Sequence, residues 1–383
     1  MPYRIAILSK YPPLEGGIAA KTYWLARGLA ARGHMVHVIT HGVSAGLEYR
    51  IPGNNDYPTP GPNLLVHRSH EDIPWHIPQD NENALGLLDL TLKVIREQAI
   101  EILDTGYLVP YGIVGHLSKA STGVCHILRH GGSDIEKFLK GAILKTILTE
   151  AISGADTVIT EKRHRDLLEP MNPCLVFQPV YIPDETVFTS RDVLEPRRRL
   201  ASIGKINYYW QHKDLHHVAR IMQELTDKFE CWFVGQGKGM SDFQHALDPQ
   251  LTSSLKWCPF VPPWEMPILL DQVDGIFIFE SRLPYPAMSN LALEALFSGV
   301  GIITDRRDFA ETYQDLVTIG HNQVLLVPPS DHSLAAEMIV PWIRERACTR
   351  QASHQLVSYQ EWLSTTEAVY SDVLNACQAK KTL

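Results

Sequence analysis

The sequence predicts an α/β protein of two Rossmann-like, parallel-sheet domains that face a cleft. Three observations predict this fold. Short apolar runs alternate with helical patterns from end to end, which is typical of parallel sheets covered by helices on both faces. The alternation breaks once, at the polar stretch VYIPDETVFTSRDVLEPRRRL, which is typical of an interdomain linker. The 383 residues are enough for two or three domains.

The first block, residues 1–185, is expected to form the N-terminal domain. A helical pattern over 18–32 ends at Gly33, a residue type that favours a helix C-terminus. The stretch 41–82 does not follow the alternation and reads as a long loop rich in Gly, Pro, Asn and His. The strands expected in this domain cover 3–9, 35–40, 64–67, 123–128, 157–160 and 174–177.

The second block, residues 198–360, is expected to form the C-terminal domain. Its predicted strands cover 200–204, 230–235, 275–279, 301–304 and 323–327, and its predicted helices cover 213–228, 264–272 and 289–298. The last stretch is helical in pattern, and we expect the C-terminal helices, with a final helix over 361–383, to bridge back to the N-terminal domain.

Composition limits the function classes. Hydrophobic residues make up 45% and charged residues 20%, as in an ordinary soluble enzyme, and the net charge of −8 argues against a nucleic-acid partner. Six cysteines without a C-x-x-C pair favour a reduced, cytoplasmic setting. The stretch KFLKGAILKTILTEAI, 137–152, mixes lysines with apolar residues. It predicts either peripheral contact with the inner membrane face or an ordinary amphipathic helix packed on the sheet.

Two candidate sites follow strands of the first block. In KYPPLEGGIAAKTYWLARGL, Gly16 and Gly17 let the backbone approach a ligand closely, and the helix N-terminus offers unpaired N–H groups that suit a phosphate. A strand-to-helix turn without a ligand is the alternative. His130, in LRHGGSDI, follows another strand, at the sheet edge where α/β proteins bind ligands. Its alternative is a solvated loop histidine.

The second block offers two lysines at one sheet edge. Lys205 follows strand 200–204 and Lys213 begins the next helix, so both could neutralise a diphosphate, or both are solvated surface lysines. His212, His216 and His217 have a spacing that could bind zinc. Because the chain has no H-E-x-x-H and no third-ligand pattern beside them, we expect no metal there.

The stretch FIFESRLPYPAMSNLALEALFSGVGIITD, 277–305, carries a carboxylate in apolar surroundings. Ser289 or Asn290 is expected to cap a helix whose first N–H groups point into the cleft. Glu294 then lies about one turn into that helix, where its carboxylate matches the two vicinal hydroxyls of a ribose. The alternative is a glutamate that merely favours the helix dipole.

In this order, the segments resemble the motifs of the family-four retaining glycosyltransferases, which have the GT-B fold. EGGIAAKTYWLARGLAARGHMVHVIT resembles the glycine loop and first helix, and RHGGSDI the His-Gly segment. SIGKIN…HKDL resembles the G-R-x…K-G element, FVGQGKG the V-G-x-G turn, and SNLALEALFSGVGIITD the second-glutamate helix. The resemblance covers nearly the whole chain.

The resemblance implies a nucleotide diphosphate sugar as co-substrate. Gly17, Lys205 and Lys213 would hold the diphosphate, Glu294 the ribose and the backbone near Val261 the base, with His130 near the transferred sugar. The other positions expected at the donor are Gly16, Gly235, Glu280, Ser289, Asn290 and Leu291. The family's usual proposal is retention without a protein nucleophile, in which the leaving phosphate oxygen deprotonates the acceptor. The chain has no D-x-D triplet, so we expect neither a metal nor a further cofactor.

The chain departs from the family in the loop before Glu294. The family pairs two glutamates separated by seven residues, and Pro286 stands where the first of them would precede Glu294. Either Glu280 replaces that glutamate, or the pocket binds a different sugar. The family's histidine near residue 105 is also absent, since DTGYLVPYG stands there.

The resemblance places a hydroxyl acceptor (a glycan, a lipid-linked sugar or a small molecule) on the N-terminal domain. The candidate wall is the loop 41–82, whose aromatic and histidine side chains suit sugars, and a structural loop is the alternative. Its side chains are His67, Arg68, His70, Trp75 and His76. Two other functions stay open: another GT-B enzyme, such as a sugar-nucleotide epimerase or a phosphorylase, and a non-catalytic nucleotide-binding relative.

Overall fold

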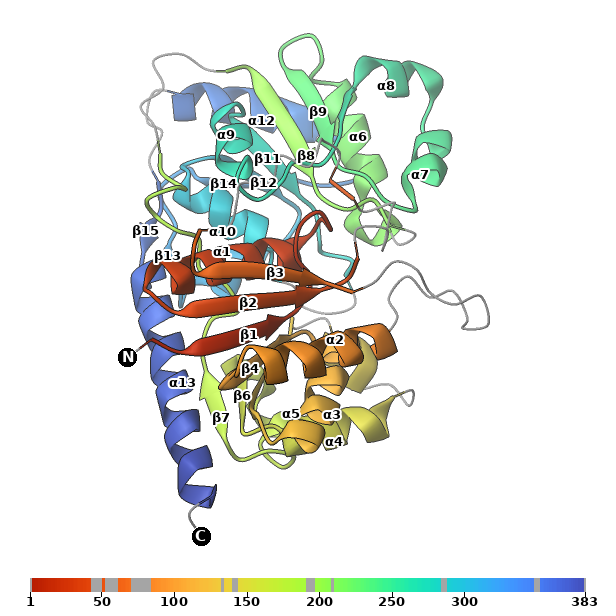
Figure 1. Ribbon diagram of the computed structural model, residues 1–383. Helices are drawn as coiled ribbons and strands as arrows, with labels where there is room; N and C mark the ends of the chain where they lie inside the picture. The colour runs from red at the N-terminus through yellow and green to blue at the C-terminus, as the bar shows by residue number, and fades with distance from the viewer. Residues whose placement is uncertain are drawn as a thin grey trace.

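The computed structural model of the chain consists of two α/β domains (Figure 1). It describes residues 2–42, 50–51, 61–69, 84–131, 134–139, 144–190, 197–207, 210–283, 288–347 and 352–381. Each domain contains a parallel sheet with helices beside it, and the linker and the last helix, α13 (Tyr359–Lys381), connect the two. The predicted fold class is confirmed.

The N-terminal domain holds a seven-stranded parallel sheet in the order β3-β2-β1-β4-β5-β6-β7. Its strands are β1 (Arg4–Leu8), β2 (Met35–Thr40), β3 (Leu64–Arg68), β4 (Ile102–Gly106), β5 (Cys125–Arg129), β6 (Thr157–Thr160) and β7 (Leu175–Phe177). Its α-helices are α1 (Gly17–Ala31), α2 (Ala84–Glu97), α3 (Ile113–Thr122), α4 (Lys145–Gly154) and the short α5 (Arg165–Leu168). The sheet is fully parallel, as the alternation of strands and helices predicted.

The C-terminal domain repeats this plan with a six-stranded parallel sheet in the order β10-β9-β8-β11-β12-β14. Its strands are β8 (Arg199–Ile203), β9 (Glu230–Val234), β10 (Lys256–Cys258), β11 (Gly275–Ile278), β12 (Gly301–Thr304) and β14 (Val324–Leu326). Its helices are α6 (Leu215–Gln223), α7 (Met240–Ala246), α8 (Pro249–Ser254), α9 (Met266–Asp271), α10 (Asn290–Phe297), α11 (Phe309–Tyr313) and α12 (His332–Ala347). A two-stranded antiparallel pair, β13 (Val317–Thr318) with β15 (His354–Gln355), lies apart from it.

Both sheets change direction of winding once, between β1 and β4 and between β8 and β11. In open α/β sheets, ligands bind outside the carboxyl ends of the strands at such a switch point, because the loops on either side diverge there. The two glycine-containing loops of interest, after β1 and after β8, both leave the sheets at these points. The topology therefore predicts one binding region in each domain.

Strand β4 was not among the expected strands, although it lies in the middle of the N-terminal sheet. Its sequence, ILDTG, places an aspartate in a strand that is buried along its whole length. Asp104 is fully buried, and the Arg129 Nε from β5 donates to both carboxylate oxygens at 2.9 and 2.8 Å. A buried charge is tolerated when it is paired and hydrogen-bonded, so an aspartate can stand in this strand. Because the aspartate interrupts the apolar run, the sequence pattern did not indicate a strand here.

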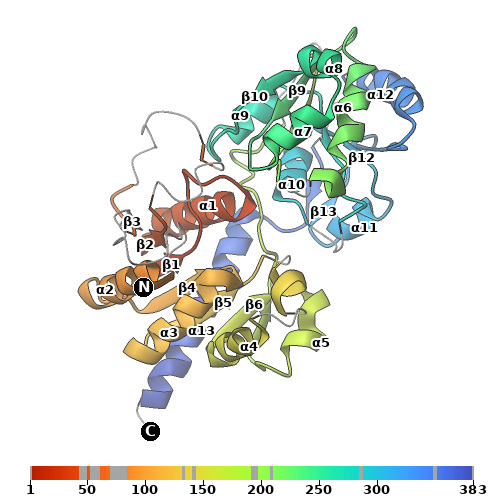
Figure 2. The same ribbon diagram turned by 90° about the vertical axis from the view of Figure 1, so that its right-hand side faces the viewer.

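Of the two C-terminal helices, α12 packs against α6 in the C-terminal domain, and α13 returns to the N-terminal domain (Figure 2). The Tyr370 hydroxyl of α13 donates to Asp104 at 2.7 Å, and Arg32 forms an ion pair with Glu367 at 2.6 Å. The Trp362 indole N–H donates to the Pro179 carbonyl at 2.9 Å. These contacts fasten α13 to the first sheet and to the linker.

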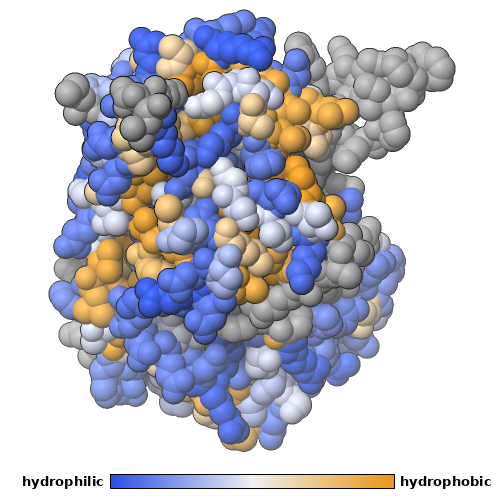
Figure 3. Space-filling view, turned by 90° about the horizontal axis from the view of Figure 1, so that it is seen from below, coloured by the Kyte–Doolittle hydropathy of each residue, from blue (hydrophilic) through white to orange (hydrophobic). Residues whose placement is uncertain are grey.

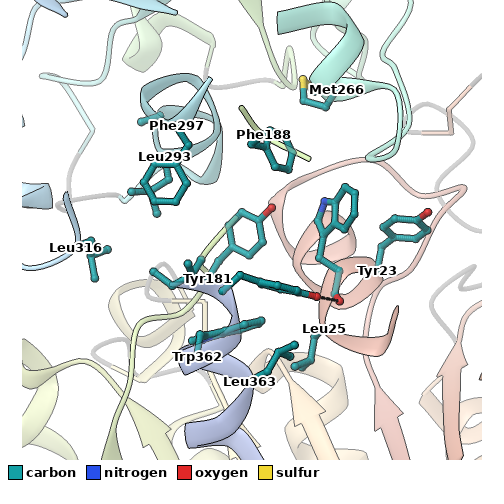
Figure 4. Close-up of a cluster of buried hydrophobic side chains, with 14 of the residues drawn as sticks. Tyr23, Leu25, Tyr181, Phe188, Met266, Leu293, Phe297, Leu316, Trp362 and Leu363 are labelled. Carbon is teal, nitrogen blue, oxygen red and sulfur yellow. Dashed lines mark hydrogen bonds between the residues drawn. The ribbon is translucent and has the colours of Figure 1, made fainter. Parts of the chain in front are cut away.

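A shared apolar cluster joins the two domains (Figure 4). Tyr181 and Phe188 come from the linker, Trp362 from α13 and Leu293 from α10, and each of these side chains is at most 2% exposed. Burial of large aromatic side chains is a strong source of stability. The cluster therefore fixes the linker next to α10, the helix that carries Glu294.

Helix α4 overlaps the stretch 137–152, for which peripheral membrane contact was predicted as one alternative. Its Leu148, Ala151 and Ile152 are fully buried, so its apolar face packs on the domain core. On the face of the molecule seen from below, hydrophobic residues show in several places among hydrophilic ones (Figure 3). Among the described residues, no helix is both long and apolar enough to cross a bilayer. Peripheral membrane contact stays a prediction.

Candidate active site between the two domains

A cleft of about 630 Å³ lies between the domains and is lined by residues of both. This volume is within the range of small-molecule sites. It collects ten of the twelve predicted site residues: Gly16, Gly17, Lys205, Lys213, Val261, Glu280, Ser289, Asn290, Leu291 and Glu294. Loops at the carboxyl ends of β1, β8 and β11 and the start of α10 supply most of them.

The glycine loop approaches the opposite domain closely. Gly16 has a φ of 119°, a conformation that side chains rarely adopt, and a Cβ there would lie 2.7 Å from the Lys205 Cε. The Asn290 side-chain amide donates to the Gly17 carbonyl oxygen at 2.9 Å. Glycine suits position 16 because of this conformation and because a side chain there would enter the space that Lys205 occupies.

The start of α10 differs from the expectation. Ser289 occupies the N-cap position, but its side chain makes no capping hydrogen bond, and its backbone N–H donates to the Tyr313 hydroxyl at 2.8 Å. Asn290 does not cap the helix either, because its amide reaches across the cleft to Gly17. The N-cap position of Ser289 is therefore confirmed, but without the side-chain hydrogen bond that a cap usually makes.

Glu15, a carboxylate of the glycine loop that was not predicted as a site residue, interacts electrostatically with Lys205 and Lys213. Glu15 is 1% exposed, and neither of its oxygens has a hydrogen-bond partner among the described residues. Burial raises the pKa of Glu15 to about 8, against the attraction of Lys205 and Lys213, which lowers it. The sequence offered a signal for this residue, because an acidic residue stands directly before Gly16 and Gly17. The prediction for this loop rested on the glycines alone.

Glu294 is held by the linker. The Tyr181 hydroxyl donates to the Glu294 Oε1 at 3.1 Å, and both side chains are almost fully buried. Burial raises the pKa of Glu294 to about 8, while the hydrogen bond from Tyr181 lowers it. Glu294, which was predicted to bind a ribose, therefore lines the cleft. One of its carboxyl oxygens is positioned by Tyr181, which was not among the predicted site residues.

Glu280 lines the cleft and interacts electrostatically with Lys213, as Glu15 does. Its Oε2 is buried without a hydrogen-bond partner among the described residues, and the Arg306 Nη1 lies 3.9 Å from it. Burial raises the pKa of Glu280, against the effects of Lys213 and Arg306. The Asp305 carboxylate holds the loop by accepting from the Glu280 backbone N–H at 2.9 Å. Arg306 and Asp305 were not predicted.

Two predicted site residues lie outside the cleft lining. His130 is 2% exposed, and its Nε2 is 2.7 Å from the Thr160 hydroxyl. Burial and the neighbouring His164 hold its pKa well below the usual range. Gly235 lies where β8 and β9 end, and a Cβ there would be 2.0 Å from the Gly204 carbonyl oxygen. Gly235 therefore allows close packing of two loops.

The histidines beside Lys213 form a small polar cluster. Ligand atoms of Asp214, His216 and His217 lie within 4.8 Å of one another. The Asp214 carboxylate is 3.0 Å from the Arg282 guanidinium, and the His217 Nδ1 is 2.9 Å from the His332 Nε2. The expectation that the site uses no metal stays a prediction.

Several predicted features lie outside the described residues. Pro286 is one, and most of the loop 41–82, including His70, Trp75 and His76, is another. His67 and Arg68 are described at the end of β3. The His67 Nε2 is 2.9 Å from the His37 Nδ1, and Arg68 donates to the Pro12 carbonyl at 2.6 Å. Neither side chain lines the cleft.

The arrangement suits a ligand with two negative charges and a diol. Lys205 and Lys213 offer cations, the starts of α1 and α10 offer backbone N–H groups, and Glu294 offers a carboxyl group to hydroxyls. Charge that develops on a departing group would be stabilised here, because the donors are already fixed in a partly enclosed site.

Comparison with known proteins agrees with this fold. Residues 197–344 match the family described as "Glycosyl transferases group 1". The chain is 26% identical over 194 residues to N-acetyl-alpha-D-glucosaminyl L-malate synthase from Bacillus anthracis, in a match covering 49% of this chain and 47% of that protein. The match therefore spans about half the length of the curated relative.

Solved structures extend the likeness to both domains. Sucrose-phosphate synthase from Thermosynechococcus elongatus has a TM-score of 0.66 at 15% identity, covering 98% of this chain and 100% of that one. Anabaena HepE, in complex with UDP and glucose, has a TM-score of 0.59 at 14% identity, covering 99% and 98%. UDP-GlcNAc 2-epimerase from Methanocaldococcus jannaschii has a TM-score of 0.57 at 11% identity, covering 96% and 99%. The chain thus has the GT-B fold throughout, and residues 197–344 match the group 1 glycosyl transferase family.

Proposed function

We propose that the protein is a metal-independent, retaining glycosyltransferase that moves a sugar from a nucleotide diphosphate sugar to a hydroxyl acceptor. One observation carries the proposal: Lys205, Lys213 and Glu294 converge with the glycine loop on a single cleft between the domains. A diphosphate between the two ammonium groups would leave its ribose beside Glu294. The similar Anabaena protein was solved with UDP and with UDP-glucose, which makes a UDP-sugar the first donor to test.

In the proposed reaction, the bond between the anomeric carbon and the diphosphate oxygen breaks, and its electron pair leaves with the diphosphate. The acceptor hydroxyl oxygen bonds to the same face of that carbon, and its proton passes to the leaving phosphate oxygen. This chain's contribution is positioning and charge stabilisation. Lys205 and Lys213 would stabilise the departing diphosphate. Glu280 would contact the transferred sugar in place of the glutamate that Pro286 replaces.

The test has two stages. First, thermal shift with UDP, GDP and ADP identifies the base, because a ligand at 100-fold its dissociation constant stabilises the folded state by about 2.7 kcal/mol. Second, nucleotide sugars with the preferred base are incubated without acceptor. Slow release of free sugar with retained anomeric configuration supports the transferase. No shift with any nucleotide, at concentrations up to the millimolar range, contradicts the proposal.

The same incubation separates the alternatives. An epimerase with this fold is among the similar structures, so fold does not exclude that chemistry. Conversion of the nucleotide sugar to its epimer, detected by NMR, would favour an epimerase. Binding without hydrolysis, epimerisation or transfer to any acceptor would favour a non-catalytic nucleotide-binding relative.

A further inference from the structure

The N-terminal part of the cleft has a chemical character of its own. It is lined by residues that follow four neighbouring strands, β1, β4, β5 and β6, and by the first turns of α1. Among these lining residues are Lys10, Lys21, Tyr107, Gly131, Glu161 and Arg163. This wall belongs to the domain opposite Lys205 and Lys213, so it is the part of the cleft that the proposed donor leaves to a second substrate.

Lys21 is the unusual member of this wall. It belongs to the buried stretch of α1 and is only 2% exposed, yet it lines the cleft. Its ammonium group forms no hydrogen bond or ion pair with another described residue, and it keeps contact with the cleft space. Burying an ammonium without such a partner is unfavourable, so buried lysines are almost always paired. A lysine kept in this state beside a cavity indicates a partner that arrives with the ligand.

The nearest carboxylates do not fill that role. Asp104 is bound by the Arg129 guanidinium and the Tyr370 hydroxyl. Asp134 accepts three backbone N–H groups, from Leu108 at 2.8 Å, Gly131 at 2.9 Å and Ile135 at 3.1 Å. Both act on Lys21 only through space. Burial and the repulsion of Arg129 lower the pKa of Lys21 to about 8, although Asp104 and Asp134 act to raise it.

The other charged groups considered on this wall are Arg163, Glu161 and Lys10, and together they carry a net positive charge. Arg163 is paired with Glu161, whose Oε2 accepts from the Arg163 Nε at 2.6 Å, so this pair is close to neutral. Lys10 follows β1 and is partly exposed. The N-terminal wall therefore presents Lys21 at depth and Lys10 nearer the solvent. Of its carboxylates, Glu161 is paired with Arg163, and Glu15 interacts with Lys205 and Lys213 of the opposite wall.

We propose that the acceptor carries an anionic group, a phosphate or a carboxylate, and that Lys21 binds it. The inference rests on the proposed function, because it names the chemical class of that reaction's second substrate. An acceptor without the anion would enclose the Lys21 ammonium unpaired, and a site built for a polar partner strongly rejects analogues that lack it.

The test uses acceptors in pairs that differ only in charge, with the nucleotide sugar that the protein hydrolyses. Glucose 6-phosphate is compared with glucose, fructose 6-phosphate with fructose, and L-malate with its neutral diamide. The wild type is expected to transfer to the charged member of at least one pair at least ~10²-fold faster than to the neutral one. The phosphate and carboxylate pairs distinguish the two sources of the anion.

Lys21→Met is the diagnostic variant, and Lys145→Met, on the exposed side of α4, is the matched control. Lys21→Met should reduce the charged-to-neutral rate ratio by ~10²-fold, and Lys145→Met should retain the wild-type ratio. Equal use of charged and neutral acceptors by the wild type would overturn the inference. An unchanged ratio in a folded Lys21→Met protein would overturn it too.

Two further outcomes are decisive. If the wild type hydrolyses the donor but uses no acceptor in the panel, inorganic phosphate and malonate replace the acceptors in thermal shift. Stabilisation of the wild type that is lost in Lys21→Met, or in Lys21→Gln should the first variant not fold, supports the inference, and no stabilisation by either anion overturns it. Failure to bind any nucleotide would instead refute the proposed function.

Discussion

The two walls of the cleft carry charge in different ways. On the C-terminal wall, Lys205 and Glu280 follow neighbouring strands and Glu294 lies about one turn into α10. The carboxylate of Glu280 interacts there with Lys213 and Arg306. On the N-terminal wall, Lys21 comes from a buried helical stretch, and the carboxylates that act on it, Asp104 and Asp134, are already held by other hydrogen bonds. The C-terminal wall therefore offers a ligand groups of both charges. The N-terminal wall offers a buried cation, for which we proposed an anionic group of the acceptor as the partner.

The largest effect is expected from removing a cation of the C-terminal wall. Lys213→Ala should lower turnover by about 10²-fold or more, because charge on the departing diphosphate loses a fixed partner. Lys228→Ala removes an exposed lysine away from the cleft and is the control. Steady-state rates with saturating donor measure the effect. An unchanged rate in Lys213→Ala would remove this residue from the mechanism.

Removing the carboxyl group from α10 should act on binding. Glu294→Ala should weaken UDP binding by roughly 10-fold, since Glu294 keeps its proton near neutral pH and a hydrogen bond between neutral groups contributes about 0.5–1.5 kcal/mol. Isothermal titration with UDP and with inorganic pyrophosphate measures the effect. The loss should be larger for UDP, because pyrophosphate has no ribose. Equal losses for both ligands would argue against ribose contact.

Glu280 tests whether the C-terminal wall selects the sugar. Glu280→Gln should change the ratio of rates for two competing donor sugars by about 10-fold, the effect of roughly one 1.4 kcal/mol interaction. Glu311→Gln, on the exposed side of α11, serves as the control. A donor profile identical to the wild type would refute the idea that Glu280 replaces the family's first glutamate.

Glu15 should make UDP binding depend on pH. Its pKa is raised to about 8, and a bound diphosphate would raise it further by repulsion, so binding takes up a proton. UDP affinity of the wild type should therefore fall several-fold as pH rises from 7.5 to 9, by at most tenfold per pH unit for one proton. Glu15→Gln should flatten this dependence. If UDP affinity of Glu15→Gln depended on pH as steeply as that of the wild type, Glu15 would not be the group that takes up the proton.

The smallest effect concerns stability and arises from the same two raised pKa values, those of Glu15 and Glu294. Between pH 4.5 and 8, the unfolded chain loses these protons while the folded protein keeps them, so the free energy of unfolding should fall as pH rises. Glu15→Gln should raise the Tm at pH 8 relative to the wild type, by roughly 2–4 °C for each kcal/mol recovered. Equal melting temperatures at pH 5 and 8 would contradict this.

Features that depend on local pattern could be predicted from the sequence. The alternation of strands and helices revealed both sheets, and the glycine loop, the two lysines and Glu294 stood at recognisable offsets from strand ends. Local pattern did not reveal β4, whose buried aspartate is neutralised by Arg129 from a neighbouring strand. Tyr181 and Arg306 were missed for a similar reason. Their roles depend on contacts with Glu294 and Glu280, which are distant in the chain.

Two failures of local reasoning are instructive. Ser289 has the residue type of a helix cap, yet its side chain makes no capping bond, because the backbone there is held by Tyr313 and Asn290 turns to Gly17. His130 stands at a strand end but bonds Thr160 outside the cleft lining. Position along the chain places a residue at a sheet edge, and only packing decides which way its side chain points.

A crystal structure with UDP bound would test the central claim most directly. The account predicts the diphosphate in the interdomain cleft, with Lys205 and Lys213 within hydrogen-bond distance of its oxygens and the ribose hydroxyls beside Glu294. UDP bound elsewhere, or bound in the cleft with Lys213 and Glu294 turned away from it, would contradict the account.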